Sequence, residues 1–143
     1  MNNLTLQPDN QPTLAEWLAT DVCVIACLCA AWCDTCTAYK IKFDELASLH
    51  PDQRFVWIDI EDRADIVGDL DITNFPTLLI QHGDIVSFFG TVQPDLRLAD
   101  RLLRAQLEKS RAELEAEASS SEERRSWQQD CNLRVRLADA QKI

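Results

Sequence analysis

The sequence predicts an α/β fold, in which a mixed β-sheet carries helices on both faces and a helical C-terminal extension follows. Two apolar runs, residues 22–29 and 54–60, are typical of central strands buried on both faces. Segments with helical spacing of apolar residues alternate with these runs. Two β-rich segments, residues 77–81 and 85–89, flank a short turn that contains glycine. Strands that alternate with helices and end in a hairpin indicate a mixed sheet covered by helices.

The first half of the chain supplies one edge strand, two helices and both central strands. Residues 4–6 alternate between apolar and polar and predict the edge strand. Thr13, followed three residues later by Glu16, predicts a capping box that starts a short helix. A longer helix is expected from Asp34 to His50, because Pro51 bars its continuation. Its buried residues recur at helical spacing and are Tyr39, Phe43, Leu46 and Ala47.

The second half supplies a short helix, the hairpin and another long helix. Residues 62–70 predict a short helix with acidic side chains on its outer face. The hairpin turns at His82-Gly83-Asp84. Pro94 suits the first position of the next helix, and Asp95 follows it. The expected buried stripe of this helix consists of Leu96, Ala99, Leu103 and Leu107.

Residues 113–143 form a charged extension that we expect to be separate from a domain over residues 1–112. The triplet Ser119-Ser120-Ser121 interrupts the helix that runs from Pro94, and a second helix can restart near Glu122. Trp127 is expected to dock the extension onto the domain. Residues 133–137 alternate apolar side chains with arginine, which fits a strand as well as a helix, and the helix is favoured.

The negative charge of the chain is concentrated in residues 1–94, and it limits the classes of molecule that this part can bind. The formal net charge is −10, and residues 1–94 alone hold 14 acidic and 4 basic side chains. Such a surface argues against nucleic acid, whose phosphates require lysine and arginine. No apolar run is long enough to span a membrane, and no secretory signal is visible in residues 1–12. We therefore expect a cytoplasmic protein, in which six cysteines indicate redox chemistry, metal binding or buried packing.

The stretch from Ala30 to Cys36 is the expected centre of the chemistry. Cys33 and Cys36 are spaced C-x-x-C where a strand runs into a helix, which is typical of a redox unit. A helix that opens at the first cysteine stabilises its thiolate, the form that attacks disulfides. Three further cysteines share one strand face and are interpreted as buried packing, with a zinc or cluster site as the alternative. They are Cys23, Cys27 and Cys29.

Over roughly residues 4–110 the sequence resembles the thioredoxin family. Trp32 precedes the two cysteines as in the redox motif of that family, and Phe75-Pro76-Thr77 matches its cis-proline segment. Gly90 matches a glycine that follows the last strand. The resemblance implies that Cys33 is the nucleophile and Cys36 the resolving thiol, with no metal and no cofactor. It also implies that the site is shaped by Trp32, Asp34, Thr35, Phe75 and Pro76.

The sequence departs from the pattern of the family at the site itself. Asp34-Thr35 replaces the usual Gly-Pro, and Thr37 replaces a common lysine. Cys27 stands in the place of a buried aspartate that assists the resolving cysteine, and Trp57 in the place of the lysine that pairs with it. The charged proton-relay pair is therefore missing, and water or a nearby acid such as Asp59 is the alternative base.

The favoured function is that of a thiol–disulfide oxidoreductase. It would reduce protein disulfides through Cys33 and Cys36, and a reductase would regenerate its dithiol. The expected partners are therefore disulfide-containing proteins and this reductase, and neither nucleic acid nor a membrane. The alternative function is a redox-sensing or chaperone-like interaction module on the same fold, with little turnover.

Overall fold

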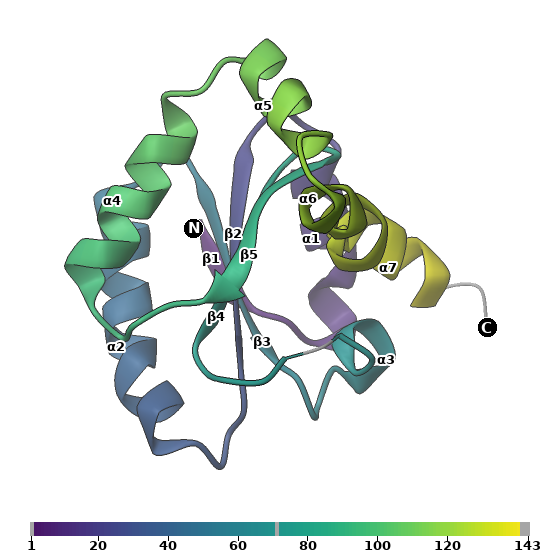
Figure 1. Ribbon diagram of the computed structural model, residues 1–143. Helices are drawn as coiled ribbons and strands as arrows, with labels where there is room; N and C mark the ends of the chain where they lie inside the picture. Colours follow the sequence, from purple (N-terminus) through teal and green to yellow (C-terminus); the bar gives the residue numbers. More distant parts are fainter. Residues whose placement is uncertain (1, 71, 141–143) are drawn as a thin grey trace.

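The computed structural model describes residues 2–70 and 72–140 and contains a five-stranded mixed sheet in the order β1-β3-β2-β4-β5 (Figure 1). β1, β3 and β2 are parallel to one another, whereas β4 is antiparallel to β2 and to β5. This arrangement confirms the predicted fold class. The strands are β1 (Asn3–Thr5), β2 (Cys23–Cys29), β3 (Arg54–Asp59), β4 (Thr77–His82) and β5 (Ile85–Thr91).

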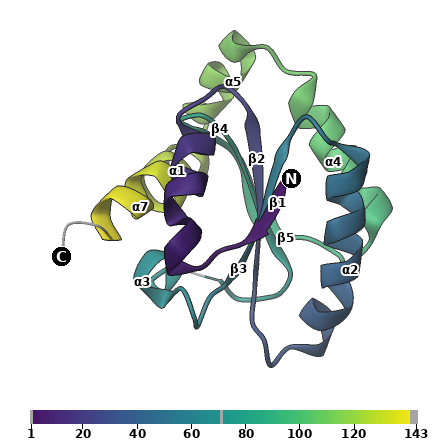
Figure 2. The ribbon, with the colours of Figure 1, turned by 180° about the vertical axis from the view of Figure 1, so that it is seen from behind.

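Helices cover both faces of this sheet. Figure 1 shows α2 and α4 on one side and α1, α3 and α7 on the other, and Figure 2 shows the same layers from behind. The helices are α1 (Gln11–Leu18), α2 (Asp34–Leu49), α3 (Ala64–Val67), α4 (Leu96–Leu107), α5 (Arg111–Ala118), α6 (Glu122–Ser126) and α7 (Leu133–Ala140). A 3₁₀ turn, η1 (Pro8–Asn10), precedes α1, and a π-helical turn, η2 (Trp127–Cys131), joins α6 to α7. Among the described residues, no helix combines the length and apolar character of a membrane span.

The central strand β2 is buried along its whole length, and its side chains alternate between two cores. Val24, Ala26 and Leu28 belong to the core beneath α1, α3 and α7. The other four residues belong to the core beneath α2 and α4, and they are Cys23, Ile25, Cys27 and Cys29. This alternation confirms that the three strand cysteines share one face.

The first predicted helix starts earlier than expected, so the capping box at Thr13 and Glu16 is wrong. α1 begins at Gln11, and Pro12 occupies its first turn, where the missing N–H of proline costs nothing. Asn10 fixes the chain before it, because its side-chain oxygen accepts a hydrogen bond from the Gln7 amide at 2.7 Å. Thr13 is consequently already helical and cannot act as the N-cap.

Two further helix boundaries differ from the expectation. The helix after Pro94 begins at Leu96, because the Asp95 side chain caps it by accepting a bond from the Arg97 amide at 2.8 Å. It ends at Leu107 and does not run on to the serine triplet. Ser110 starts α5 through a capping box with Glu113, a pattern that the sequence reasoning overlooked.

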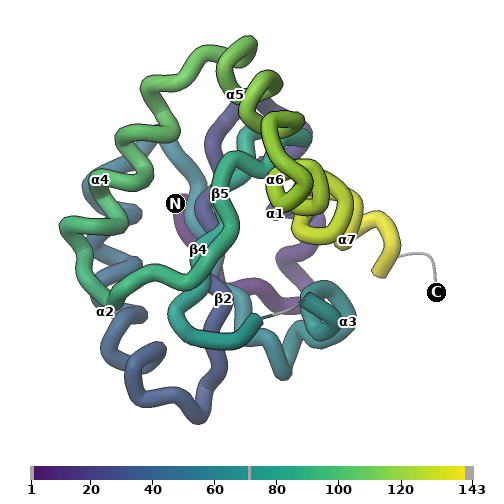
Figure 3. Tube along the Cα trace, in the orientation of Figure 1, coloured from purple at the N-terminus to yellow at the C-terminus, as the bar shows by residue number. Residues whose placement is uncertain are grey.

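The C-terminal extension is helical, as predicted, and it is part of the hydrophobic core. Ser121 caps α6, and residues 133–140 form a helix, which excludes the strand alternative. Trp127 docks the extension as expected, and it is joined in the core by Cys131, Leu133 and Leu137. Figure 3 shows α7 lying beside α1, and the turn η2 before it contacts β5. The predicted boundary after residue 112 lies within α5, and the division into two parts stays a prediction.

A buried glutamine of β4 fixes the extension to the sheet. The Gln81 side-chain oxygen accepts a hydrogen bond from the Leu133 amide at 2.9 Å, and its nitrogen donates to the Asn132 side chain at 2.8 Å. Asn132 in turn donates to the carbonyl of Asp84 in the hairpin turn at 3.0 Å. Because buried amides require such partners, the extension and the hairpin depend on one another.

Candidate redox site

The C-x-x-C motif lies where β2 runs into α2, at the lower end of the sheet in Figure 1. Cys33 is the N-cap of α2, and its carbonyl accepts a hydrogen bond from the Thr37 amide at 3.1 Å. Cys33 is partly exposed, whereas Cys36 is only 1% exposed. One cysteine therefore faces solvent at the start of the helix, and the other faces the sheet one turn further on.

Cys36 forms a disulfide with Cys29, the last residue of β2, and not with Cys33. The two Cα atoms are 5.8 Å apart, and Cys29 is also only 1% exposed. Cys33 remains a free thiol. The sequence analysis treated Cys29 as packing and missed this partner. The signal was present, because the strand face that holds Cys29 is the face that the first turn of α2 covers.

Asp59 holds the loop that leads to the cysteines. It follows the buried part of β3 and lies opposite Cys29 in the sheet register. One carboxylate oxygen accepts a hydrogen bond from the Ala31 amide at 3.0 Å. The other accepts bonds from the Glu61 and Asp62 amides at 2.9 and 3.0 Å. Asp59 thus positions the motif backbone, a role that the sequence reasoning did not assign to it.

A cavity of about 360 Å³ borders Cys36 on the side of β3. Its polar lining includes Asp59 and Lys40, whose ammonium lies 5.6 Å from the centre of the Trp57 ring. Trp57 stands where the family resemblance implied a lysine, and here Lys40 of α2 places a cation beside that position. Deeper in the core, burial raises the pKa of the Cys27 thiol, and Lys40 acts in the opposite direction. Cys27 therefore stays protonated near neutral pH.

The predicted site-shaping residues Trp32, Phe75 and Pro76 lie together beside the motif. The Trp32 and Phe75 rings meet edge to face with centroids 5.7 Å apart, and Trp32 is 68% exposed. The Phe75–Pro76 peptide bond is cis, as the resemblance implied. The other two predicted residues, Asp34 and Thr35, open α2 and are exposed. The surface around Cys33 is thus aromatic and solvent-exposed.

The remaining cysteines lie apart from the motif or deeper in the core. Cys27 Sγ is 3.9 Å from Cys29 Sγ, so a third sulfur lies beside the Cys29–Cys36 disulfide. Cys23 lies at the other end of β2, where its sulfur is 3.8 Å from His82 Nε2, and burial raises the pKa of its thiol to about 12. Within residues 2–70 and 72–140, no three His, Cys, Asp or Glu side chains are placed to bind a metal ion.

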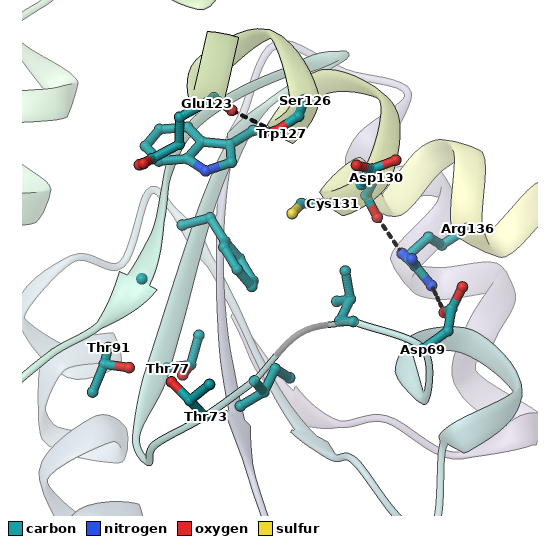
Figure 4. Close-up of a pocket in the computed structure, with 14 residues that line it drawn as sticks. Asp69, Thr73, Thr77, Thr91, Glu123, Ser126, Trp127, Asp130, Cys131 and Arg136 are labelled. Atoms are coloured by element: carbon teal, nitrogen blue, oxygen red, sulfur yellow. Dashed lines mark hydrogen bonds and ion pairs between the residues drawn. The ribbon is translucent and has the colours of Figure 1, made fainter. Parts of the chain in front are cut away.

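A second cavity, of about 490 Å³, lies between the extension and the cis-proline segment (Figure 4). Thr73, Thr77 and Thr91 line one side of it. Trp127, Cys131 and Arg136 line the other side. Arg136 closes one end by donating to the Asp69 carboxylate and to the Asp130 carbonyl, both at 2.6 Å. None of the motif cysteines lines this cavity, which separates it from the candidate redox site.

Gly90 lines this cavity and lies within the last strand, not after it as expected. It pairs with Leu78 inside β5, which ends at Thr91, so it does not follow the last strand. A bulge between Ile80 and Gln81 shifts the register of the hairpin before this point. Such a shift cannot be read from the spacing of the motifs alone.

Comparison with known proteins supports the assignment that the geometry suggests. The Thioredoxin family model matches residues 7–103. A relative from Oryza sativa subsp. japonica, the thioredoxin-like protein CXXS1, is 33% identical over 73 residues, which are 50% of this chain and 55% of that protein. The match thus spans about half the length of this relative.

Solved structures share the fold at low sequence identity. Thioredoxin O1 from Arabidopsis thaliana superposes with a TM-score of 0.61 at 20% identity and covers 73% of this chain and 97% of that one. A structure of ferredoxin:thioredoxin reductase in complex with thioredoxin f2 gives a TM-score of 0.63 at 20% identity, over 75% of this chain and 96% of that one. Since the family model also covers more than half of the residues, the chain belongs to the thioredoxin family.

Proposed function

We propose that this protein is a thiol–disulfide oxidoreductase that reduces protein disulfides through Cys33 and Cys36. The observation that carries the proposal is the contrast between the two sulfurs of the motif. Cys33 is partly exposed at the start of α2, while Cys36 is buried one helical turn away. An accessible cysteine at a helix N-terminus is suited to attack a substrate disulfide. A buried cysteine one turn away is suited to resolve the mixed disulfide that this attack forms.

The reaction consists of two displacements at sulfur. The Cys33 thiolate attacks one sulfur of the substrate disulfide, which forms a mixed disulfide and releases the first substrate thiolate. Cys36 then attacks the Cys33 sulfur, which releases the second substrate thiolate and leaves the protein oxidised. Two electrons pass from the cysteines to the substrate. A reductase must return them, and the neighbouring structure of a thioredoxin bound to a reductase supports this class of partner.

Proteins are the proposed substrates because of the surface around Cys33. Trp32 and Phe75 offer an exposed aromatic contact that a peptide chain can cover. Six acidic residues lie between Asp59 and Asp71, within a chain of net charge −10, so basic polypeptides are favoured. The proposal includes the cytoplasm as the location, because a dithiol reductant must be kept reduced.

Reduction of insulin disulfides in the presence of dithiothreitol tests the proposal. Cys33→Ser should abolish turnover, because it removes the attacking sulfur. Cys36→Ser should instead accumulate mixed disulfides, which are visible as adducts on a non-reducing gel. Cys23→Ala is a matched control, since Cys23 is buried at the far end of β2. Full activity in Cys33→Ser would contradict the assignment of the nucleophile.

The Cys29–Cys36 disulfide favours a second candidate function. While Cys36 is bound to Cys29, a partner attached to Cys33 has no resolving thiol. The protein would then be a redox-sensing or chaperone-like module that holds its partner with little turnover. The insulin assay separates the two functions, because a holding module gives stable adducts on Cys33 and little reduction.

A further inference from the structure

We propose that Cys29 is a third redox-active cysteine, which competes with Cys33 for Cys36. This inference deepens the proposed function and rests on Cys33 and Cys36 being its dithiol. Three sulfurs lie next to one another in the core, since Cys36 is bonded to Cys29 and Cys27 Sγ is 3.9 Å from Cys29 Sγ, and Cys33 lies partly exposed at the start of α2, three residues before Cys36. Of these four cysteines only Cys36 and Cys29 are bonded to each other, and Cys33 keeps a free thiol.

The packing of α2 on β2 brings Cys29 to Cys36. Cys29 ends β2 on the face that α2 covers, and Cys36 is the third residue of α2. Their Cα separation of 5.8 Å is in the range that a disulfide bridges without backbone movement, about 4.4–6.8 Å. Cys33 is three residues before Cys36, the spacing at which two sulfurs meet across one helical turn. Cys36 therefore has two partners within reach.

The proposed step is an internal thiol–disulfide exchange. The Cys29 thiolate attacks the Cys36 sulfur of the Cys33–Cys36 disulfide. The Cys29–Cys36 bond forms, the Cys33–Cys36 bond breaks, and Cys33 departs as a thiolate. The chain holds one disulfide and one thiol before and after, so no external oxidant or reductant is needed. The Cys29 thiol loses its proton to form this thiolate, and the proton ends on the departing Cys33 sulfur or in solvent.

The surroundings of the two competing sulfurs favour the exchanged form. Cys29 lies in an apolar core, where a thiolate is costly because it loses its hydration. Cys33 is partly exposed at the start of α2, so a free sulfur there keeps its contact with water. The exchange therefore moves the free sulfur from the interior to the surface. The forward and reverse steps both pass through a Cys29 thiolate in the core, so the preference comes from the surroundings of the free sulfur and not from the barrier.

The exchange changes what the oxidised protein can do. With a Cys33–Cys36 disulfide the surface carries no free thiol and waits for a reductase. With a Cys29–Cys36 disulfide the oxidised pair is buried, and the free thiol of Cys33 can form a mixed disulfide with a second partner. A mixed disulfide formed at that stage persists, because Cys36 is occupied. When reductant is scarce, Cys29 thus changes a site that reduces disulfides repeatedly into one that keeps its partner bound to Cys33.

Disulfide mapping of the oxidised wild-type protein tests the bond directly. After alkylation of free thiols in acid, a protease that cleaves before aspartate separates residues 21–33 from residues 34–43. Cys36 is then linked to a peptide that contains both Cys29 and Cys33, and fragmentation assigns the partner. We expect the bond at Cys29 and the alkyl group on Cys33. The proposal is overturned if the bond is at Cys33 and the alkyl group on Cys29.

Counting fast-reacting thiols in the folded, oxidised protein gives a second test. With an aromatic disulfide reagent, the wild type and the buried-cysteine control Cys23→Ala should each show one fast thiol per chain. Cys29→Ala should show none, since Cys36 can then pair only with Cys33. A fast thiol that persists in oxidised Cys29→Ala, or that is missing from the wild type, overturns the proposal. Cys29→Ser replaces Cys29→Ala if that variant does not fold.

Insulin reduction separates this inference from the proposed function. If the thiol counts are as expected but neither the wild type nor Cys29→Ala reduces insulin, the exchange stands and the reductase function fails. If both proteins reduce insulin and their oxidised forms give equal thiol counts, the function stands and the exchange is wrong.

Discussion

At the scale of single residues, the interior around Cys36 lacks the charged base that the family resemblance implied. Cys27 occupies that place, and burial keeps its thiol protonated near neutral pH. Asp59 reaches the same cavity, but its carboxylate already accepts three backbone hydrogen bonds. Neither group is therefore arranged as a dedicated acceptor for the proton of Cys36.

Replacing Cys27 by aspartate should accelerate the resolving step. A carboxylate beneath Cys36 can take the proton, and a positioned general base contributes about 10²–10⁴-fold. The buried charge should lower the free energy of unfolding. Stopped-flow measurement of mixed-disulfide decay checks the rate, with Cys27→Ala as the control that should change little. An aspartate variant that folds but resolves no faster would show that Cys27 is only packing.

Replacing Asp59 by asparagine should loosen the loop before Cys33. The amide nitrogen of asparagine cannot accept the hydrogen bond from Ala31, and two donors would face each other. Because this hydrogen bond is exposed to solvent, its loss should cost about 0.5–1.5 kcal/mol. Urea denaturation measures this loss. Asp62→Asn, an exposed neighbour, should change stability by less than about 0.5 kcal/mol.

At the scale of elements, the end of the β4–β5 hairpin couples stability to pH through His82. Burial lowers the pKa of His82, and Lys109 and Arg111 lower it further. The folded protein therefore binds fewer protons than the unfolded chain once the pH falls below about 6.5. Because the unfolded state then binds more protons, the free energy of unfolding decreases as the pH drops from 7.5 to 5.

His82→Gln should make this decrease smaller. The substitution removes the titrating ring but leaves His50, the other histidine, in place. Urea midpoints at pH 7.5 and pH 5 for both proteins provide the comparison. Equal decreases in the two proteins would mean that another group causes the dependence on pH.

The elements show how far the sequence determined the fold. Strand burial and the hairpin were predictable because β2 is apolar throughout and Gly83 adopts φ +59° in the turn. Helix starts were less predictable, since several residues compete for each cap, and among the described helices the capping bonds are accepted by Asp95, Ser110 and Ser121. The motif and its aromatic neighbours were found, but the Cys29–Cys36 bond was not. The alternation along β2 places Cys29 on the face that α2 covers, but whether Cys36 comes within bonding distance depends on how α2 packs against β2, which no local pattern records.

At the scale of the whole molecule, the extension completes the core on one face of the sheet. Leu133 is fully buried in that core, and its amide bonds to Gln81. Leu133→Ala should cost about 2–5 kcal/mol of unfolding free energy, as for other large buried side chains. Val135→Ala, on the same helix but 42% exposed, should cost less than about 0.5 kcal/mol. Chemical denaturation compares the two.

The reactivity of Cys33 should survive the Leu133 substitution. The extension contacts the face beneath α1 and α3, whereas the motif belongs to α2 and the opposite face. The rate of Cys33 alkylation in the folded variant should therefore equal that of the wild type. A slower or faster rate would show that the extension influences the redox site across the sheet.

The hydrogen bonds of Gln81 with Asn132 and Leu133 have a consequence for synthesis on the ribosome. Residues 127–137 are made after the five strands of the sheet. Until they are made, Gln81 lacks its partners, and the part of the apolar face that α1 and α3 do not cover is exposed. The nascent chain therefore exposes a surface that attracts chaperones, and it closes that surface itself only when α7 arrives.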